Sequence, residues 1–238
     1  MPSPREIIPN HLSQVGTLSL VSTPIGNLED ITLRAIRTIK EVDIVACEDT
    51  RTTGNMLNLL GIHAQKLLSY HAHSSGGRED YIVSLLLEGQ NIALVSDAGT
   101  PGISDPAYAL VRKAISAGIT ITPIPGASAL LAGLVCSGLP THHFMYLGFL
   151  PVKKGRQTLL RTLPDIDMTV VIYESVHRIE RTIADLAGVL GEDRNIVMGR
   201  EITKKFESFA RGRLGDFVSG MIHYEKKGEF VLAIAPKT

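Results

Sequence analysis

The first half of the chain alternates short apolar runs with segments of helical period. Apolar runs rich in β-branched residues lie at 17–22, 43–47, 66–70, 92–97 and 119–124. Segments with apolar residues at helical spacing lie between them, at 31–42, 51–61, 78–89 and 106–118. Glycine just past the last periodic residue is a typical helix stop, and three segments have one: Gly61, Gly89 and Gly118. This alternation predicts βαβ units around a mainly parallel sheet.

The pattern changes after residues 123–126. A helix is predicted over 127–138, followed by two more near 155–162 and 177–190. Predicted strands alternate with them, at 143–151, 167–175, 195–202, 205–212 and 229–236. More strands and fewer long helices indicate a mixed sheet, hence a second α/β domain. We therefore expect a polar tail at 1–15, an N-terminal α/β domain at 16–123 and a C-terminal α/β domain at 124–238.

Composition and charge limit the function. The chain has 238 residues, of which 44% are hydrophobic and 20% charged, which excludes disordered and collagen-like classes. Twenty-four basic side chains balance twenty-four acidic ones, which argues against holding naked nucleic acid by bulk electrostatics. Residues 1–150 carry nine basic and twelve acidic side chains, and the remainder fifteen and twelve. Because the net charge is zero, any contact with RNA should involve a local group of basic side chains rather than the whole surface.

The cysteines and the apolar runs indicate the compartment. Cys47 and Cys136 each lie in an apolar run, which favours two buried thiols over a disulfide framework. No signal-peptide pattern opens the chain, and no run approaches the roughly 20 apolar residues that span a bilayer. We expect a soluble, cytoplasmic protein without a membrane partner.

Three turns of small residues each follow a predicted strand. In the first turn, Thr23–Asp30, Pro24 and Gly26 force a tight bend while Asn27 and Asp30 can cap a helix. Backbone N–H groups would face outward above the carboxyl edge of the sheet, where α/β proteins bind ligands. A plain connection between strand and helix remains the alternative.

The second turn, Val95–Pro106, is long and rich in small residues. Its backbone can approach a ligand closely, and Asp97 and Thr100 offer an acceptor and a donor. In the third turn, Pro123–Ala129, Ser128 lies near a helix start and can donate to a carboxylate or a ribose. Three such turns after three strands would converge on one ligand site.

Acidic and basic groups cluster at other strand ends. Glu48, Asp49 and Arg51 suit either a capped helix start with a surface ion pair or a cluster for acid–base chemistry and phosphate contact. Glu174 and Glu201 at the ends of later strands favour function. Nearby basic side chains form either a solvated face or a phosphate track: Arg178, Arg181, Lys204 and Lys205.

Several signatures are missing from the sequence. It contains no Gly-Lys dipeptide of a Walker loop, no HExxH and no GxSxG. The eight histidines show no ligand spacing with the two cysteines. Metal chemistry and nucleophile-elbow chemistry are therefore disfavoured.

Seven motifs in order resemble a known family. They are TPIGNLEDITLRA, EDTRTTGNML, NIALVSDAGTPGISDP, PIPGASAL, GFLPVKKGRQ, VIYESVHRI and REITKKFESFARG. Together they span about residues 17–235 and resemble the bacterial ribosomal RNA small subunit methyltransferase I family, within the tetrapyrrole methylase superfamily. TPIGN, SDAGTP and YESxHR point to this family within the superfamily.

The resemblance implies two α/β domains of the tetrapyrrole methylase type, with a ligand cleft between them, in a homodimer. It implies that S-adenosylmethionine is bound in a bent shape and that its methyl group goes to the ribose 2′-oxygen of a cytidine in the decoding region of 16S rRNA, in the assembled small subunit. It also implies a cofactor set that acts mainly through the backbone: Pro24, Ala98, Gly99, Thr100, Ile103, Ser128, Ala129, Tyr173 and Glu174. Many family members continue into a C-terminal helical extension past the last strand; if that extension helps to bind RNA, we expect this chain to bind RNA without it or with a partner.

The chemistry suggests roles for the remaining candidates. A ribose hydroxyl is a poor nucleophile at neutral pH, so an acid should accept or relay its proton: Asp49, Glu48 or Glu201. Arg51, Arg178 and Lys204 are the expected RNA contacts. No metal is needed, because the cofactor carries an activated methyl group.

Two alternatives remain at this stage. The first is methylation of a porphyrin-like or precorrin ring on the same fold, although such proteins usually show a glycine-rich first loop and GGDP where this chain has TPIGN and AGTP. The second is a non-catalytic ribosome-assembly factor that senses the cofactor. Absorbance on mixing with a tetrapyrrole separates the first, and binding without methyl transfer identifies the second.

Overall fold

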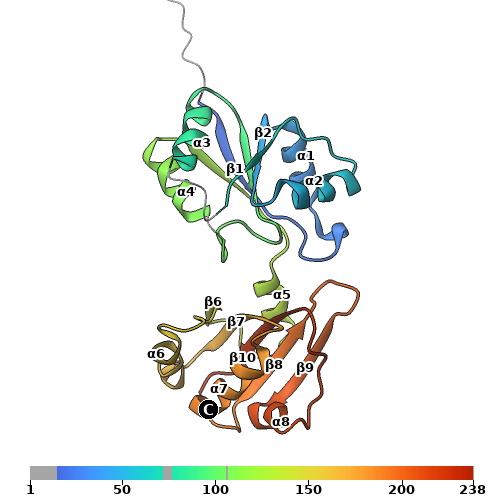
Figure 1. Ribbon diagram of the computed structural model, residues 1–238, viewed down its shortest axis with the longest axis vertical. Coiled ribbons are helices and arrows are strands. Elements are labelled where there is room, and N and C mark those ends of the chain that lie inside the picture. Colours follow the sequence, from blue (N-terminus) through green and yellow to red (C-terminus); the bar gives the residue numbers. More distant parts are fainter. Residues whose placement is uncertain (1–14, 72–76, 106, 238) are drawn as a thin grey trace, which may run out of the picture. The chain divides into compact units, whose positions relative to one another are not determined.

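The chain folds into two compact units (Figure 1). A computed structural model describes residues 15–71, 77–105 and 107–237. The first unit holds the described residues up to Val21, Leu33–Asp97 and Asp105–Ile124; the second holds Ser22–Thr32, Ala98–Ser104 and the chain from Pro125 onward. Two segments of the N-terminal half thus belong to the second unit. The expected tail falls almost wholly outside the described residues, and the linear division at 123/124 stays a prediction.

The first unit is a parallel sheet with helices on both faces, as the alternating pattern predicts. Its strands are β1 (Thr17–Val21), β2 (Ile44–Cys47), β3 (Leu67–Ser69), β4 (Ile92–Val95) and β5 (Thr120–Ile124). They are ordered β3-β2-β4-β1-β5, and every pairing is parallel. The helices are α1 (Leu33–Glu41), α2 (Thr50–Leu59), α3 (Arg78–Leu87) and α4 (Ala107–Ser116).

Continuous apolar runs suit these strands because both faces are covered. All four residues of β2 and all four of β4 are buried. Ile82 and Leu86 of α3 and Leu110 of α4 pack on the face that carries Leu18 and Ile44. In Figure 1, α1 and α2 lie on the other side of this sheet. The carboxyl ends of all five strands therefore share one edge, from which the three turns depart.

The second unit is a mixed sheet. Its strands are β6 (Phe144–Phe149), β7 (Thr169–Ser175), β8 (Asn195–Arg200), β9 (Ser208–Arg213) and β10 (Glu229–Ile234). They are ordered β6-β7-β10-β8-β9; β6 is parallel to β7, and the other pairs are antiparallel. The helical segments are η1 (Leu28–Asp30), α5 (Ala129–Val135), α6 (Arg156–Leu160), η2 (Leu163–Asp165), α7 (Ile179–Leu190) and α8 (Leu214–Val218).

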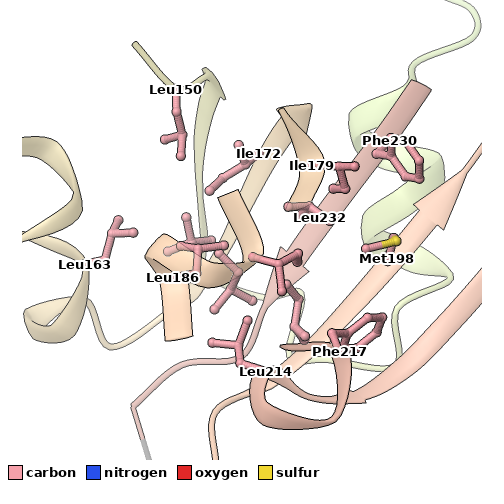
Figure 2. Close-up of a cluster of buried hydrophobic side chains, with 14 of the residues drawn as sticks. Leu150, Leu163, Ile172, Ile179, Leu186, Met198, Leu214, Phe217, Phe230 and Leu232 are labelled. Atoms are coloured by element: carbon pink, nitrogen blue, oxygen red, sulfur yellow. The ribbon is translucent and has the colours of Figure 1, made fainter. Parts of the chain in front are cut away.

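Two clusters cover the opposite faces of this sheet. Figure 2 shows the larger, in which Leu186 of α7 and Phe217 of α8 pack on Ile172 and Leu232 of the sheet. On the other face, Leu130 and Leu134 of α5 pack against Val171, Val231 and Ile202. Among the residues that the structure describes, Ile25 of the first turn and Ala129 of the third pack on the α5 face and not on the other.

The structure departs from the sequence-based expectations in two places. The helix α8 was not predicted, since five residues give too short a pattern to show a period. The expectation that both thiols are buried is right for Cys47 and wrong for Cys136, which is exposed. Cys136 is the C-cap of α5 and follows the exposed Val135. This short helix buries Leu130, Gly133 and Leu134, and Cys136 lies beyond them.

Candidate functional site

The three turns are tied together by side-chain hydroxyls. Ser22 Oγ lies 3.0 Å from Thr100 Oγ1, and Thr100 Oγ1 also lies 3.2 Å from the carbonyl oxygen of Ala127, to which it can donate. The backbones of Thr23 and Gly99 bond reciprocally at 2.9 and 3.1 Å. The first, second and third turns therefore meet within the second unit, as the sequence predicts they should.

Small residues permit this close approach. A Cβ on Gly126 would lie 2.9 Å from Ser22 Cβ, so a larger residue there would push the third turn away from the first. Gly99 has φ +86°, a backbone conformation that costs a side-chain-bearing residue about 1 kcal/mol or more. At these two positions the close approach of the turns and the backbone conformation therefore require glycine.

Aromatic side chains from the sheet support the turns. The backbone N–H of Leu130 in α5 donates to the Tyr173 hydroxyl at 2.8 Å. The hydroxyls of Tyr146 and Ser104 lie 2.7 Å apart, and Ser104 holds a positive φ of 65°. Burial raises the pKa of Tyr173 well above that of an ordinary phenol, so it stays a neutral hydroxyl. The Tyr173 ring contacts those of Tyr146 and Phe149 edge to face, at 5.1 and 5.7 Å.

The residues of the expected cofactor set all belong to the second unit, and most lie in the turns. Pro24 and Gly99 are buried, whereas Ala98 and Ile103 are exposed. Ser128 caps α5, whose first residue is Ala129. All residues of the expected cofactor set thus lie in one compact unit. One of them has a side chain that points away from the turns.

That residue is Glu174. Its carboxylate is fully buried, and both oxygens have donors: Thr182 Oγ1 at 2.6 Å on one, Arg178 Nε and the Ser175 N–H at 2.8 Å on the other. Thr182 belongs to α7, so this side chain points to the face opposite α5. Any contact of Glu174 with a ligand in the turns would have to come from its backbone.

Arg178 is engaged inside the same network. Its Nε bonds Glu174, its Nη1 donates to the Leu150 carbonyl at 2.9 Å, and its Nη2 is buried without a hydrogen-bond partner among the described residues. The expectation that this guanidinium contacts RNA therefore gains no support from its geometry. Its position explains instead why the YESxHR motif forms one structural unit, since Glu174 near the end of β7 pairs with Arg178 at the N-cap of α7.

Asp49 is a helix cap. It is the N-cap of α2, accepting the Arg51 N–H at 2.8 Å, and it also forms an ion pair with the Arg51 side chain at 2.8 Å. The hydrogen bonds from Arg51 lower the pKa of Asp49 to about 2. A carboxylate held so strongly in its charged form is a weak proton acceptor. The cap and surface pair, one of the two interpretations left open by the sequence, thus account for Asp49 and Arg51.

Glu201 and Lys204 form an ion pair that also includes Glu229. Glu201 Oε1 accepts the Glu229 N–H at 2.9 Å and Lys204 Nζ at 3.0 Å, and Lys204 Nζ also bonds Glu229 at 2.9 Å. Burial acts to raise the pKa of Glu201, but these hydrogen bonds outweigh it and leave the pKa below the ordinary value. A Cβ on Gly26 would lie 2.2 Å from Lys204 Cγ, so the stem of this lysine packs on the first turn.

Glu48 differs from the other two acids. Burial and the neighbouring charges of Asp97 and Asp105 raise its pKa, against a hydrogen bond from the Asp97 backbone and the charge of His71. Glu48 follows β2, and Asp97 follows β4, so both stand at the carboxyl edge of the first sheet. Asp97 itself lies in the second turn, just before Ala98. Among the three acidic candidates, only Glu48 has a raised pKa.

Sequence reasoning missed several supporting residues. Ser22 was treated as the last residue of a strand, and Tyr146 and Thr182 had no signal of their own. Their partners are distant in sequence: Thr100 lies 78 positions after Ser22, and Tyr146 lies 42 positions after Ser104. Among the described residues, no cluster of three or more His, Cys, Asp or Glu could hold a metal ion, and no helix is long and apolar enough to span a bilayer.

Known proteins share this architecture. The model of the Tetrapyrrole (Corrin/Porphyrin) Methylases family matches residues 17–218. A solved structure of diphthine synthase superposes with a TM-score of 0.72 at 17% identity, covering 92% of this chain and 90% of that one. Uroporphyrin-III C-methyl transferase from Thermus thermophilus, complexed with S-adenyl homocysteine, gives 0.63 at 20% identity, covering 92% and 97%. The chain thus belongs to the Tetrapyrrole (Corrin/Porphyrin) Methylases family, and it shares its fold with these solved structures.

Sequence relatives narrow the class. Ribosomal RNA small subunit methyltransferase I of Halalkalibacterium halodurans is 50% identical over 221 residues, covering 92% of this chain and 75% of the relative. The protein of the same name from Escherichia coli O157:H7 is 45% identical over 222 residues, covering 92% and 77%. The chain belongs to the ribosomal RNA small subunit methyltransferase I family.

Proposed function

We propose that this protein transfers a methyl group from S-adenosylmethionine to the ribose 2′-oxygen of a decoding-region cytidine in 16S rRNA. The observation that carries the proposal is the joining of three small-residue turns by Ser22, Thr100 and Ala127, in a chain of this family. The substrate is the assembled small subunit in the cytoplasm, and the working form is a homodimer. The zero net charge supports a shaped ribonucleoprotein over naked RNA as the substrate.

The turns fit S-adenosylmethionine in chemistry. Gly126 is exposed where the third turn approaches Ser22, while Ile103 and Leu131 expose apolar surface, at 41% and 51%. S-adenosylmethionine combines a flat adenine ring with polar ribose and amino-acid groups, and a surface of apolar side chains beside exposed backbone suits such a ligand. The residues that would hold it are the following: Pro24, Ala98, Gly99, Thr100, Ile103, Ser128, Ala129 and Tyr173.

Bound S-adenosylmethionine supplies a methyl group already activated by a positively charged sulfur. The protein must then bind the ribose, orient its 2′-oxygen and take up the proton. We assign the proton to Glu48, because Asp49 and Glu201 are held as anions by Arg51 and Lys204. A raised pKa makes Glu48 the better acceptor near neutral pH.

The exposed fractions of the Arg51 and Lys204 side chains indicate which of them can contact RNA. The Arg51 side chain is 87% exposed, and its ion pair with Asp49 can exchange for a phosphate. Lys204 is 29% exposed and already holds two carboxylates, which supports a role in orienting the first turn. Arg51 is therefore the stronger candidate for a phosphate contact.

The acceptor class is tested by offering labelled S-adenosylmethionine with three acceptors in parallel. They are small subunits lacking the modification, protein-free 16S rRNA and a uroporphyrinogen. Label in subunits above free rRNA supports the proposal. Label in the tetrapyrrole alone would move the assignment to a porphyrin-type acceptor, and cofactor binding without transfer to any acceptor would indicate an assembly factor. Both relatives described above carry the ribosomal RNA name, which favours the first outcome.

A further inference from the structure

One exposed loop of the second unit is strongly basic. The segment Phe149–Gly155 joins β6 to α6, and Lys153 and Lys154 are exposed at its tip. No described residue is an ion-pair partner of either ammonium group. From Pro125 to Pro164 the sequence contains no Asp or Glu. The loop therefore presents positive charge that no acidic neighbour in the sequence offsets.

Two guanidinium groups hold the base of this loop, the buried one of Arg156 and the partly buried one of Arg178. Arg178 Nη1 donates to the carbonyl of Leu150 at 2.9 Å, and Arg156 Nη1 lies 3.5 Å from the carbonyl of Pro151. The Arg156 side chain is only 2% exposed and forms an ion pair with Asp185 at 2.8 Å. Leu150 itself is buried in the larger core cluster (Figure 2).

Thr182 connects these two anchors. Its hydroxyl accepts Arg156 Nη2 at 2.9 Å and donates to Glu174 at 2.6 Å, while Glu174 bonds Arg178. Both carboxylate oxygens of Glu174 are satisfied in this network, and separating buried charges from their partners is costly, so the network favours one geometry of the chain it holds. The lysines thus extend from a base that is already ordered, which reduces the entropy lost when a ligand binds.

The loop is continuous with the candidate site. Phe149 begins it, and the Phe149 ring is 53% exposed and packs 5.7 Å from the ring of Tyr173. Tyr173 in turn accepts the N–H of Leu130 beside the third turn. Exposed aromatic surface next to unpaired cations suits nucleotides, whose bases stack and whose phosphates attract lysine.

We propose that the segment Phe149–Gly155 is a docking loop for the RNA backbone, with Lys153 and Lys154 contacting phosphates and the network around Thr182 positioning the loop. This inference rests on the proposed function, in which the substrate is ribosomal RNA. Neither lysine takes part in the transfer itself. Their removal should therefore weaken substrate binding and leave the chemical step intact.

The test compares two double variants. Lys153→Ala/Lys154→Ala removes the loop charges. Lys40→Ala/Lys66→Ala removes two exposed lysines from the first unit, at the last turn of α1 and just before β3, on the edge where the strands of that sheet begin. The probe is the small subunit lacking the modification, with binding measured across a salt series and turnover measured at saturating cofactor.

For the loop variant we expect KM for subunits to rise about tenfold, with kcat and cofactor affinity within twofold of wild type. The slope of log binding constant against log salt should fall in magnitude by about 1.5, because each phosphate contact contributes about 0.7 to 0.9. An unchanged slope, or an equal loss in the control, would overturn the proposal. A loss of affinity for polyglutamate without loss for subunits would identify a protein-docking surface and also overturn it.

Positioning is tested separately at Thr182. Thr182→Val should raise KM for subunits several-fold without changing the salt slope, and Thr182→Ser should restore it. A Thr182→Val variant with wild-type KM would overturn the positioning role. If wild-type protein binds subunits with the expected salt slope but transfers no methyl group, the proposed function fails while the docking loop stands.

Discussion

Tyr173 and Glu174 are neighbours on β7, yet their side chains lie on opposite faces of the sheet. Tyr173 packs with Val171 on the face covered by α5, and Glu174 bonds Thr182 of α7 on the other. A strand alternates its side chains, so one motif serves two purposes. Tyr173 supports the turns of the candidate site, and Glu174 holds the internal network that anchors Leu150.

Tyr173→Phe tests the first purpose. The variant removes the acceptor of the Leu130 N–H, which should cost about 1 kcal/mol of stability and loosen the start of α5. We expect the dissociation constant of S-adenosylmethionine, measured by titration calorimetry, to rise several-fold. Tyr108→Phe is the control, because Tyr108 is 68% exposed on α4. Equal cofactor affinity in both variants would contradict a supporting role for the Tyr173 hydroxyl.

Glu174→Ala tests the second purpose. Removing a buried carboxylate leaves the Arg178 guanidinium without its ion-pair partner, which should lower the free energy of unfolding by about 3 to 5 kcal/mol. Urea denaturation measures this loss. Glu180→Ala, which removes an exposed partner of Lys226, should leave the denaturation midpoint unchanged. A midpoint for Glu174→Ala equal to that of Glu180→Ala would show that the network is not stabilising.

Gly126→Ala tests the close approach of the turns. The new Cβ would lie 2.9 Å from Ser22 Cβ, so the third turn must shift and the cofactor affinity should fall at least tenfold. Gly188→Ala is the matched control: it lies in α7 with open space around it and should raise stability by about 0.5 to 1 kcal/mol. Cofactor binding by Gly126→Ala as tight as that of Gly188→Ala would rule out the joined turns as the binding surface.

Glu48→Gln tests the proton acceptor. Burial and the charges of Asp97 and Asp105 raise the pKa of Glu48, so the active, deprotonated form is lost at a higher pH than for an ordinary carboxylate. We expect kcat to fall by about 100-fold or more with cofactor affinity unchanged, and the acidic limb of the pH profile to disappear.

The stability of the same variant provides a second readout. A carboxyl pKa raised on folding contributes stability below the unfolded pKa, and this is lost as pH rises through the folded pKa. Glu48→Gln should therefore melt no lower than wild type at pH 7. Asp49→Asn should keep most of the turnover, since Asn also caps helices. Wild-type turnover in Glu48→Gln would refute the assignment.

The sequence predicted the local features of this protein well. Strands such as β2 and β4 are continuous apolar runs, and α3 and α4 end near glycines, so period and punctuation were enough to place them. The joining of the three turns also followed, because parallel strands must end at one edge. The strands and helices depend on residues near one another in sequence, and the meeting of the turns depends on the parallel order of the strands.

The remaining features depend on distant partners. Nothing local distinguishes Glu174 as an anchor from Glu174 as a ligand, since Thr182 and Arg178 become its partners only when α7 packs on β7. Cys136 lies in an apolar run, yet it is the C-cap of α5, past the last residue that this helix buries. The three candidate acids were equivalent in sequence and separate only through Arg51, Lys204 and Asp97.

The central claim is methylation of a ribose 2′-oxygen, and one measurement tests it most directly. Small subunits lacking the modification are incubated with this protein and with S-adenosylmethionine labelled in its methyl group. The rRNA is then hydrolysed in alkali. Since a 2′-O-methyl group blocks cleavage of the adjoining phosphodiester bond, the account predicts all label in a single alkali-resistant dinucleotide that begins with cytidine. Label released in mononucleotides would place the methyl group on a base and contradict the account.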